Sequence, residues 1–274
     1  MKITVLMENT TVSPEFTAEH GLSLFVETGD TRFLFDAGQS GAFADNAQRL
    51  GVDLKTADFA VLSHGHYDHG GGMLRFLDRN RRAKLYVNQN AFGIHRNAAG
   101  RYIGLDPALG ERGRLVRTGD EFAIAPGLTL FSCNQLPRPV PTDPGGLTEQ
   151  VGEFLLPDEF SHEHYLLVEE NGKRILLSGC SHKGILNILS WFRPDVLVGG
   201  FHFKDLDPEG QHLRRYGEAL ATFDTIFYTG HCTGQSQFDR LKTILGDQLH
   251  AISTGMTIEL YSVGPPVPGW PLPF

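Results

Sequence analysis

The stretch Ser63–Gly72, with the sequence SHGHYDHGGG, places three histidines and one aspartate within six residues. It follows the apolar run 59–62 (FAVL), which predicts a short buried strand, and it precedes 73–79, whose apolar spacing predicts a helix. The cluster is therefore expected on a loop that connects a strand to a helix. Loops of this kind are where α/β proteins commonly place their chemistry.

The residue types in this loop favour a metal site. Imidazole nitrogens and carboxylate oxygens are the ligands that Zn²⁺ takes when one coordination position stays open for water. Because alternate residues of a loop point to the same side, His64 and His66 are predicted to share one ion, and Asp68 and His69 to face a second. Histidines that merely form hydrogen bonds are the alternative, but such dense clustering favours the metal. The glycines at 70–72 lack the ending of a phosphate-binding loop and are expected to permit a tight turn.

The second half of the chain repeats one pattern, in which an apolar strand runs into small residues and then into a histidine, as 59–62 does before His64. Strand ends at one edge of a sheet lie close together, so these histidines are predicted to converge on one site. The repeats are 174–177 with His182, 195–198 with His202, and 225–228 with His231.

Further residues near this pattern have two interpretations each. Cys180 lies at a strand end, where a thiolate can reach a metal, but Cys180 and Cys232 also suit small buried apolar positions. Asp36 ends the strand 32–35, and it either orients a ligand histidine or caps the next helix. His20 is a candidate for a supporting contact behind the ligands.

The remaining polar residues are expected to be ordinary. His95, His212 and His250 are predicted at the surface, and His162 and His164 at the surface or satisfied by hydrogen bonds. Four basic residues are alternatives for contacts to an anionic substrate, but solvent exposure is the default expectation for them; they are Arg96, Arg101, Lys183 and Lys204.

Composition excludes several classes of function. The net charge is −8 and no cluster of Lys and Arg stands out, which argues against a nucleic-acid partner and against binding to an anionic membrane surface. No apolar run approaches the roughly 20 residues needed to cross a bilayer. Three scattered cysteines do not form a disulfide framework. These features predict a soluble cytoplasmic protein that acts on a small molecule, with an anionic one among the candidates.

The chain is predicted to form a single domain over 1–274. The segment 88–113 is weakly periodic and is interpreted as a loop insertion over the mouth of the site. The proline-rich stretch 136–146 cannot form regular structure and is expected to be a flap or a link. The tail 263–274 is also rich in proline. Its Trp270 and Phe274 are expected to pack against another surface, so a homo-oligomer is one option.

These residues resemble the metallo-β-lactamase superfamily, whose signature His-x-His-x-Asp-His is matched by 64–69 (HGHYDH). Within it the chain is similar to the metal-dependent hydrolases of β-lactamase superfamily II, a branch that includes the archaeal 7,8-dihydropterin-6-ylmethyl-4-(β-D-ribofuranosyl)aminobenzene 5′-phosphate synthase. The matching segments are 19–23 (EHGLS), 35–40 (FDAGQS), 179–182 (GCSH), 199–202 (GGFH) and 231–234 (HCTG).

The resemblance implies an α+β fold, a four-layer αββα sandwich with the metal site at one edge of two sheets. It further implies His64 and His66 on one metal, Asp68 and His69 on a second, and His231 as the ligand of the last motif. The superfamily usually has a bridging Asp where this chain has Cys180. Either His182 or the Cys180 thiolate is therefore expected to complete the first site. Two divalent ions are expected, zinc first, with manganese or iron as alternatives.

A hydrolase is the function predicted from these features. A metal-activated water would attack an ester, lactone or phosphoester, with Asp68 as a ligand that also orients the water. His202 would either contact the substrate and donate a proton, or brace a ligand. Three alternatives remain: a synthase-like transferase that joins a phosphorylated ribosyl substrate to an aminobenzoate, an iron-dependent redox enzyme on the same fold, and a metal-binding module without activity.

Overall fold

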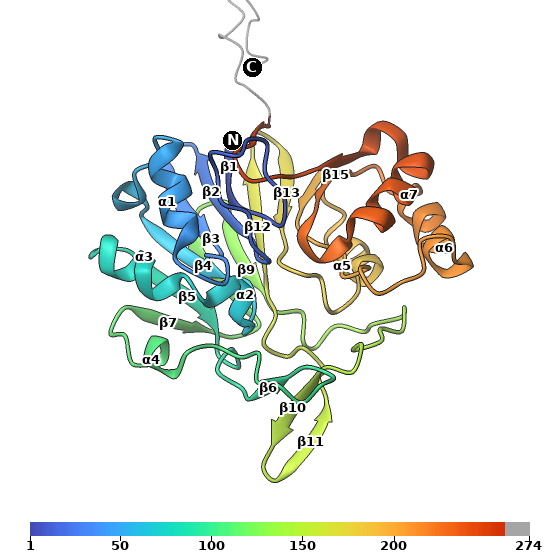
Figure 1. Ribbon diagram of the computed structural model, residues 1–274, viewed down its shortest axis with the longest axis horizontal. Coiled ribbons are helices and arrows are strands. Elements are labelled where there is room, and N and C mark those ends of the chain that lie inside the picture. The colour runs from blue at the N-terminus through green and yellow to red at the C-terminus, as the bar shows by residue number, and fades with distance from the viewer. Residues whose placement is uncertain (261–274) are drawn as a thin grey trace, which may run out of the picture.

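Two seven-stranded sheets stack face to face and form the centre of the molecule (Figure 1). The computed structural model describes residues 1–260, so the predictions on the tail 263–274 lie outside the described residues. The first sheet has the order β17 (Thr257–Glu259), β1 (Lys2–Met7), β2 (Ser23–Thr28), β3 (Thr31–Phe35), β4 (Phe59–Leu62), β5 (Lys84–Asn88) and β7 (Leu115–Thr118). The second has the order β16 (Leu249–Ala251), β15 (Ile226–Thr229), β14 (Val196–Val198), β13 (Lys173–Leu177), β12 (Tyr165–Glu170), β9 (Leu128–Phe131) and β8 (Glu121–Ala125).

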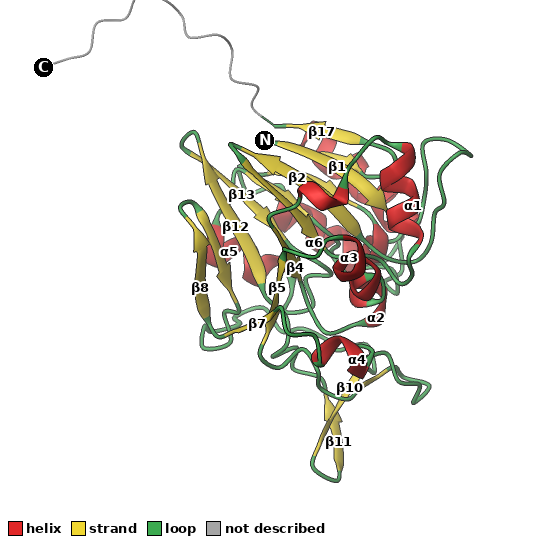
Figure 2. Ribbon diagram, turned by 90° about the vertical axis from the view of Figure 1, so that its left-hand side faces the viewer, coloured by secondary structure: helices red, strands yellow, loops and turns green. Residues whose placement is uncertain are grey.

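Helices cover the outer face of each sheet, which confirms the predicted αββα sandwich (Figures 1 and 2). The first sheet is covered by α1 (Ala42–Arg49), α2 (Tyr67–Gly70) and α3 (Met73–Arg79), and the second by α5 (Ile185–Phe192), α6 (Gln211–Leu220) and α7 (Gln235–Leu245). Within residues 1–260, every helix is too short or too polar to cross a bilayer.

Strand periodicity explains the layers. Along β2, Leu24 and Val26 point into the core between the sheets, whereas Phe25 packs under the helices of the first sheet. Along β13, Leu176 faces the helices of the second sheet and its neighbours face inward. Successive side chains of a strand point to opposite faces, so a strand buried on both faces is apolar throughout.

The segment 88–113 is more ordered than predicted. It contains β6 (His95–Arg96) and α4 (Pro107–Gly110). A hairpin of β10 (Thr148–Val151) and β11 (Phe154–Pro157), which the sequence reasoning missed, pairs with β6 and projects from the body (Figure 2). His95 was predicted at the surface, and this prediction is wrong because its side chain is fully buried.

Parallel strands in both sheets direct their carboxyl ends to the same region. β3, β4 and β5 are parallel neighbours in the first sheet, and β13, β14, β15 and β16 are parallel neighbours in the second. The backbone N–H of His164, next to β12, donates to the carbonyl of Ser63, next to β4, and so joins the two edges (2.9 Å). The histidines that follow these strands therefore come from both sheets and meet where the two sheets adjoin. The sequence had predicted that they converge at the edge of a single sheet.

The glycine run after the motif lets the backbone at Gly72 pass close to the backbone at Ala37 and Ser40. A Cβ on Gly72 would overlap the carbonyl oxygens of Ala37 and Ser40, far inside the 3.0 Å that real Cβ atoms observe. We expect Gly72→Ala to lower the free energy of unfolding by about 2 kcal/mol or more, because the backbone of Ala37 and Ser40 must move to make room for the new Cβ. Urea unfolding measures this. Gly113→Ala is the control, since nothing lies within 4 Å of a Cβ there; equal effects of both variants would contradict the explanation.

Candidate metal centre

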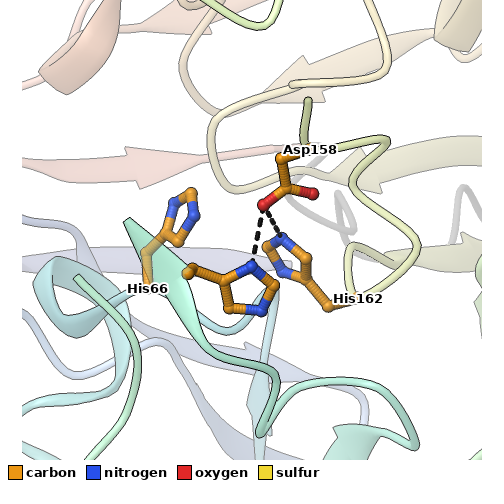
Figure 3. Close-up of side chains that lie close together, drawn as sticks. His66, Asp158 and His162 are labelled. Atoms are coloured by element: carbon orange, nitrogen blue, oxygen red, sulfur yellow. Dashed lines mark hydrogen bonds and ion pairs between the residues drawn. The ribbon is translucent and has the colours of Figure 1, made fainter. Parts of the chain in front are cut away.

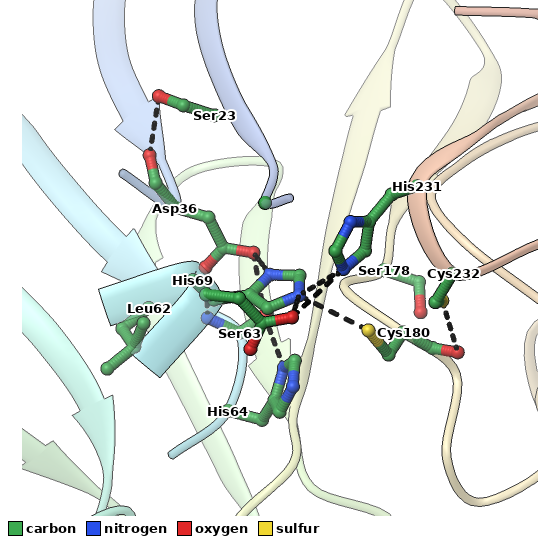
Figure 4. A network of polar contacts seen from close by, with 12 residues as sticks. Ser23, Asp36, Leu62, Ser63, His64, His69, Ser178, Cys180, His231 and Cys232 are labelled. Atoms are coloured by element: carbon green, nitrogen blue, oxygen red, sulfur yellow. Dashed lines mark hydrogen bonds and ion pairs between the residues drawn. The ribbon is translucent and has the colours of Figure 1, made fainter. Parts of the chain in front are cut away.

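The buried carboxylate of Asp36 organises the loop that carries the motif (Figure 4). Its Oδ1 accepts from the backbone N–H of Ser63 (2.7 Å), and its Oδ2 accepts from the Ser63 hydroxyl (2.7 Å) and from His69 Nδ1 (2.6 Å). This contact chooses between the two roles predicted for Asp36. It orients a candidate ligand, and it does not cap α1, whose N-cap is Gly41.

Two histidine tautomers follow from this network. Ser63 gives its only hydroxyl proton to Asp36, so His64 Nδ1 must donate to Ser63 Oγ (2.8 Å). His69 Nδ1 donates to Asp36 in the same way. Nε2 is therefore the nitrogen that each of these two rings directs toward a cation.

The first candidate group consists of His64, His66 and His182, which offer ligand atoms within 4.8 Å of one another. His64 Nε2, His66 Nε2 and both ring nitrogens of His182 are buried, and they have no hydrogen-bond partner among residues 1–260. Burial, with smaller contributions from neighbouring histidines, holds the pKa of each of these imidazoles well below 6.5. The rings are thus neutral near pH 7, the form that binds metal.

The second candidate group consists of Asp68, His69 and His231. The distances are 3.1 Å from His69 Nε2 to His231 Nε2, 3.2 Å from His231 Nε2 to Asp68 Oδ2, and 3.8 Å from His69 Nε2 to Asp68 Oδ2. Cys180 Sγ lies 3.2 Å from His69 Nε2, on the same side. The ligand atoms of a tetrahedral Zn²⁺ site with bonds of about 2.0–2.1 Å lie about 3.3 Å apart, so this arrangement fits a metal ion.

Two polar residues hold the second group from behind. Asn9 Oδ1 accepts from His231 Nδ1 (3.0 Å), and Asn9 Nδ2 lies 3.4 Å from His20 Nδ1. His20 Nε2 in turn lies 3.3 Å from Asp68 Oδ2. His20 therefore has the supporting contact that the sequence suggested, whereas the role of Asn9 was not foreseen.

The charges of this group favour a cation between the rings. The Asn9 contact leaves a lone pair on His231 Nε2, which faces His69 Nε2 directly. Burial lowers the pKa of His69, but the charges of Asp36 and Asp68 outweigh burial and raise it to about 9. Burial lowers the pKa of His231 to about 3, even though Asp68 acts in the opposite direction. Without metal, one proton on His69 would thus fill the position that a metal ion would take, and metal binding would displace it.

A third cluster, made of His95, Asp158 and His162, lies behind His66, and its two ring protons are taken up by one carboxylate oxygen (Figure 3). Its one buried nitrogen without a hydrogen-bond partner among residues 1–260 is His95 Nε2. The backbone N–H of Gly65 donates to His162 Nδ1 (2.9 Å), so the ring proton of His162 is on Nε2 and faces Asp158 Oδ2 (3.4 Å). His95 Nδ1 donates to the same oxygen (2.7 Å). These protons occupy the space where an ion would sit. We therefore interpret this cluster as a brace for the loop backbone.

His202 and Lys183 differ from the other predicted residues. The His202 ring lies 4.4 Å from the His182 ring and outside the candidate ligand groups. Its backbone is left-handed, with φ 55°. Burial, with a smaller contribution from Lys204, lowers the pKa of His202 to about 4. The default expectation of exposure is wrong for Lys183, which is fully buried and donates from Nζ to the carbonyls of Ser132 and Glu163.

Several residues that support the candidate ligands were not predicted, and for most of them no pattern in the neighbouring sequence indicates the contact. Glu8 Oε1 accepts from the backbone N–H of His231, although 223 positions separate them. Glu163 accepts from the backbone N–H groups of His182 and Lys183. Asp158 stands four positions before His162, a spacing that could have indicated a pair.

Comparison with known proteins finds similarity along most of the chain. The model of the "Metallo-beta-lactamase superfamily" matches residues 16–203. The protein MJ0448 of Methanocaldococcus jannaschii is 28% identical over 88% of this chain and 94% of its own length. The 7,8-dihydropterin-6-methyl-4-(β-D-ribofuranosyl)-aminobenzene-5′-phosphate synthase of that organism is 26% identical over 80% of this chain and 82% of its own length. The crystal structure of Tm1679, a metal-dependent hydrolase of the β-lactamase superfamily, aligns with a TM-score of 0.82 and 25% identity, over 96% of this chain and 100% of that one.

Replacement of Asp36 tests whether this carboxylate prepares the ligands. In Asp36→Asn, an amide N–H₂ would face the Ser63 hydroxyl and His69 Nδ1, both of which are donors. We expect metal affinity to fall about 10- to 100-fold, measured by competition with a chromophoric chelator while circular dichroism monitors the fold. Asp58→Asn, the same change at an exposed carboxylate that accepts from the backbone of Arg32, is the control. Wild-type affinity in a folded Asp36→Asn variant would refute the role.

Proposed function

Because the chain belongs to the metallo-β-lactamase superfamily, we propose that it is a metal-dependent hydrolase of a small-molecule ester, lactone or phosphoester. The observation that carries the proposal is the set of buried ring nitrogens of His64, His66 and His182 that have no hydrogen-bond partner among residues 1–260. Buried acceptors without partners are costly, and a divalent cation would satisfy them. Zinc suits this donor set of nitrogen, carboxylate and thiol best, with manganese or iron as alternatives.

In this proposal, His64, His66 and His182 hold one ion, and Asp68, His69 and His231 hold a second. Cys180 is an additional candidate for the second group instead of the first, because its Sγ lies beside His69. Bound divalent metals supply Lewis-acid polarisation of the scissile group and lower the pKa of water to about 7.

Residues of the chain would complete the reaction. Asp68 is held by His20 and His231, so its orientation is set before substrate arrives. His202 is neutral near pH 7, since its pKa is about 4. We therefore assign His202 to a hydrogen bond with the substrate in preference to proton donation.

A synthase activity is the second candidate, and it is favoured by the similarity to the M. jannaschii synthase. By its name that enzyme forms a compound that joins a dihydropterin methyl group to a ribofuranosylaminobenzene phosphate. Mass spectrometry of reactions that contain both halves would reveal the joined product. Its appearance, together with no hydrolysis of simple esters, would favour the synthase over the hydrolase.

Metal content tests the two groups separately. Elemental analysis of protein purified without added metal is expected to find about two divalent ions per chain. His182→Ala is expected to lose the ion of the first group. Cys180→Ala is expected to weaken mainly the second, because Cys180 Sγ lies beside His69 Nε2, although it is also within 4.8 Å of a ring nitrogen of His64. His250→Ala, which changes a half-buried histidine at the edge strand β16, is the control. Failure of wild-type protein to bind metal after reconstitution with zinc, manganese or iron would sink the proposal.

Turnover tests the reaction class. A panel of p-nitrophenyl acetate, bis-p-nitrophenyl phosphate and a γ-lactone is expected to yield hydrolysis of at least one member, with loss of turnover on chelation and in His66→Ala. His202→Asn is expected to keep its metal and to lose about tenfold in kcat/KM, the effect of one hydrogen bond to the reacting group. Loss of metal in His202→Asn would instead make this residue a ligand or a brace. Turnover that survives complete removal of metal would exclude the proposed mechanism.

A further inference from the structure

A pocket of about 560 Å³ opens directly beside the first candidate group. His182 and His202 form the end of the pocket nearest to the proposed metals. Its volume is that of a site for a small organic ligand. The pocket extends from there toward α6, so a molecule attacked at the metal centre has space on this side for a further group.

The floor and one wall of the pocket are apolar and aromatic. Phe201 and Phe203 are almost fully buried beneath it. The ring of Tyr216 lies 4.7 Å from that of Phe203 and 5.0 Å from that of His212, the latter pair nearly parallel at 28°. Such a surface favours a planar or acyl group, since burial of apolar area from water is the main gain there.

The proline-rich stretch also lines the pocket, and hydrogen bonds anchor it to α5. The backbone N–H of Val140 donates to Asn187 Oδ1 (3.0 Å), and Asn187 Nδ2 donates back to the carbonyl of Val140 (2.8 Å). Trp191 Nε1 donates to the carbonyl of Pro137 (3.0 Å). Of the two roles predicted for this stretch, flap or link, these contacts argue against a free flap and make the pocket a formed site.

One cation lines the pocket. Arg215 is exposed on α6 and has no ion pair among residues 1–260. Its neighbour Arg214 is engaged with Glu218 (2.8 Å). Asp143 also lines the pocket, and its carboxylate accepts from the backbone N–H of Gly145 within its own turn and has no ion pair among residues 1–260. The guanidinium of Arg215 is therefore available to an anion.

We propose that the pocket binds the aryl or acyl group of the substrate and that Arg215 pairs with a carboxylate or phosphate carried on that group. The proposal deepens the proposed function and rests on it for the bond that is broken. It assigns the enzyme to amphipathic anionic esters or phosphoesters. Arg215 was not indicated by the sequence, where an anion contact was only an alternative for Arg96, Arg101, Lys183 and Lys204.

Binding and turnover test this assignment separately. The binding probe is 1-naphthoate, with neutral 1-naphthalenemethanol as its counterpart, titrated by calorimetry into the metal-loaded protein. Arg215→Ala is expected to weaken naphthoate binding about tenfold and to leave the alcohol unchanged, whereas Arg214→Ala changes neither. Leu186→Trp, which fills the pocket, is expected to abolish both. Ser190→Trp, the same new side chain on the exposed face of the same helix, is expected to bind like wild type.

The turnover experiment compares the mono-p-nitrophenyl ester of adipate with the neutral p-nitrophenyl hexanoate. Arg215→Ala is expected to reduce the ratio of their kcat/KM values about tenfold, and Arg214→Ala to preserve it. Equal effects of the two arginine variants would overturn the anion contact. Wild-type binding by a folded Leu186→Trp would overturn the pocket. Naphthoate binding that responds to the variants, with no ester hydrolysed, would support the pocket and count against the hydrolase alone.

Discussion

The hydrogen bonds to the Asp36 carboxylate are the constraint on which the candidate site depends. A buried charge is stable only where donors surround it, and here the donors are a backbone N–H, a hydroxyl and an imidazole N–H. These bonds join the end of β3 to the motif loop and to His69. They also set the proton positions on His64 and His69. Residues that are not themselves candidate ligands, Asp36 and Ser63, thus determine which ring nitrogens can bind a metal.

The fold supplies the second condition, which is convergence. The carboxyl ends of the parallel strands of both sheets lie close together, and we call this region the rim. Short loops after these strands hold residues that are far apart in the sequence. Several of these residues are held in left-handed backbone conformations, including Asp36, Ser181, His202 and His231. Such conformations cost of order 1–3 kcal/mol each and persist where the surrounding contacts over-determine them. Their concentration at the rim indicates that packing of the two sheets stabilises a site that is locally unfavourable.

Much of this could be predicted because strand-end histidines and alternating apolar residues leave a local signal. The sequence predicted the strand before His64, the helix at 73–79 and the convergence of the later histidines. The residues that support the candidate ligands through hydrogen bonds could not be predicted from the sequence. Asn9 and Glu8 act across long separations, and no residue near them indicates a partner. Asp158 lies only four positions before His162, but its contact to His95 spans 63 positions. His95 looked like a surface residue because the hairpin that covers its strand, β10 and β11, has no periodic apolar face.

The arrangement of the rings argues that a cation belongs to the native state. Burial of His64, His66 and His182 leaves ring nitrogens without donors among residues 1–260. His69 and His231 present their Nε2 atoms to each other at 3.1 Å, and each is fixed by a contact on its other nitrogen. A protein that only needed to fold would satisfy the acceptors of His64, His66 and His182 with donors from the chain. In the cluster around Asp158 the carboxylate takes up the ring protons of His95 and His162, and His95 Nε2 alone lacks a partner among the described residues. The contrast between these neighbouring histidine clusters separates a structural brace from a site prepared for metal.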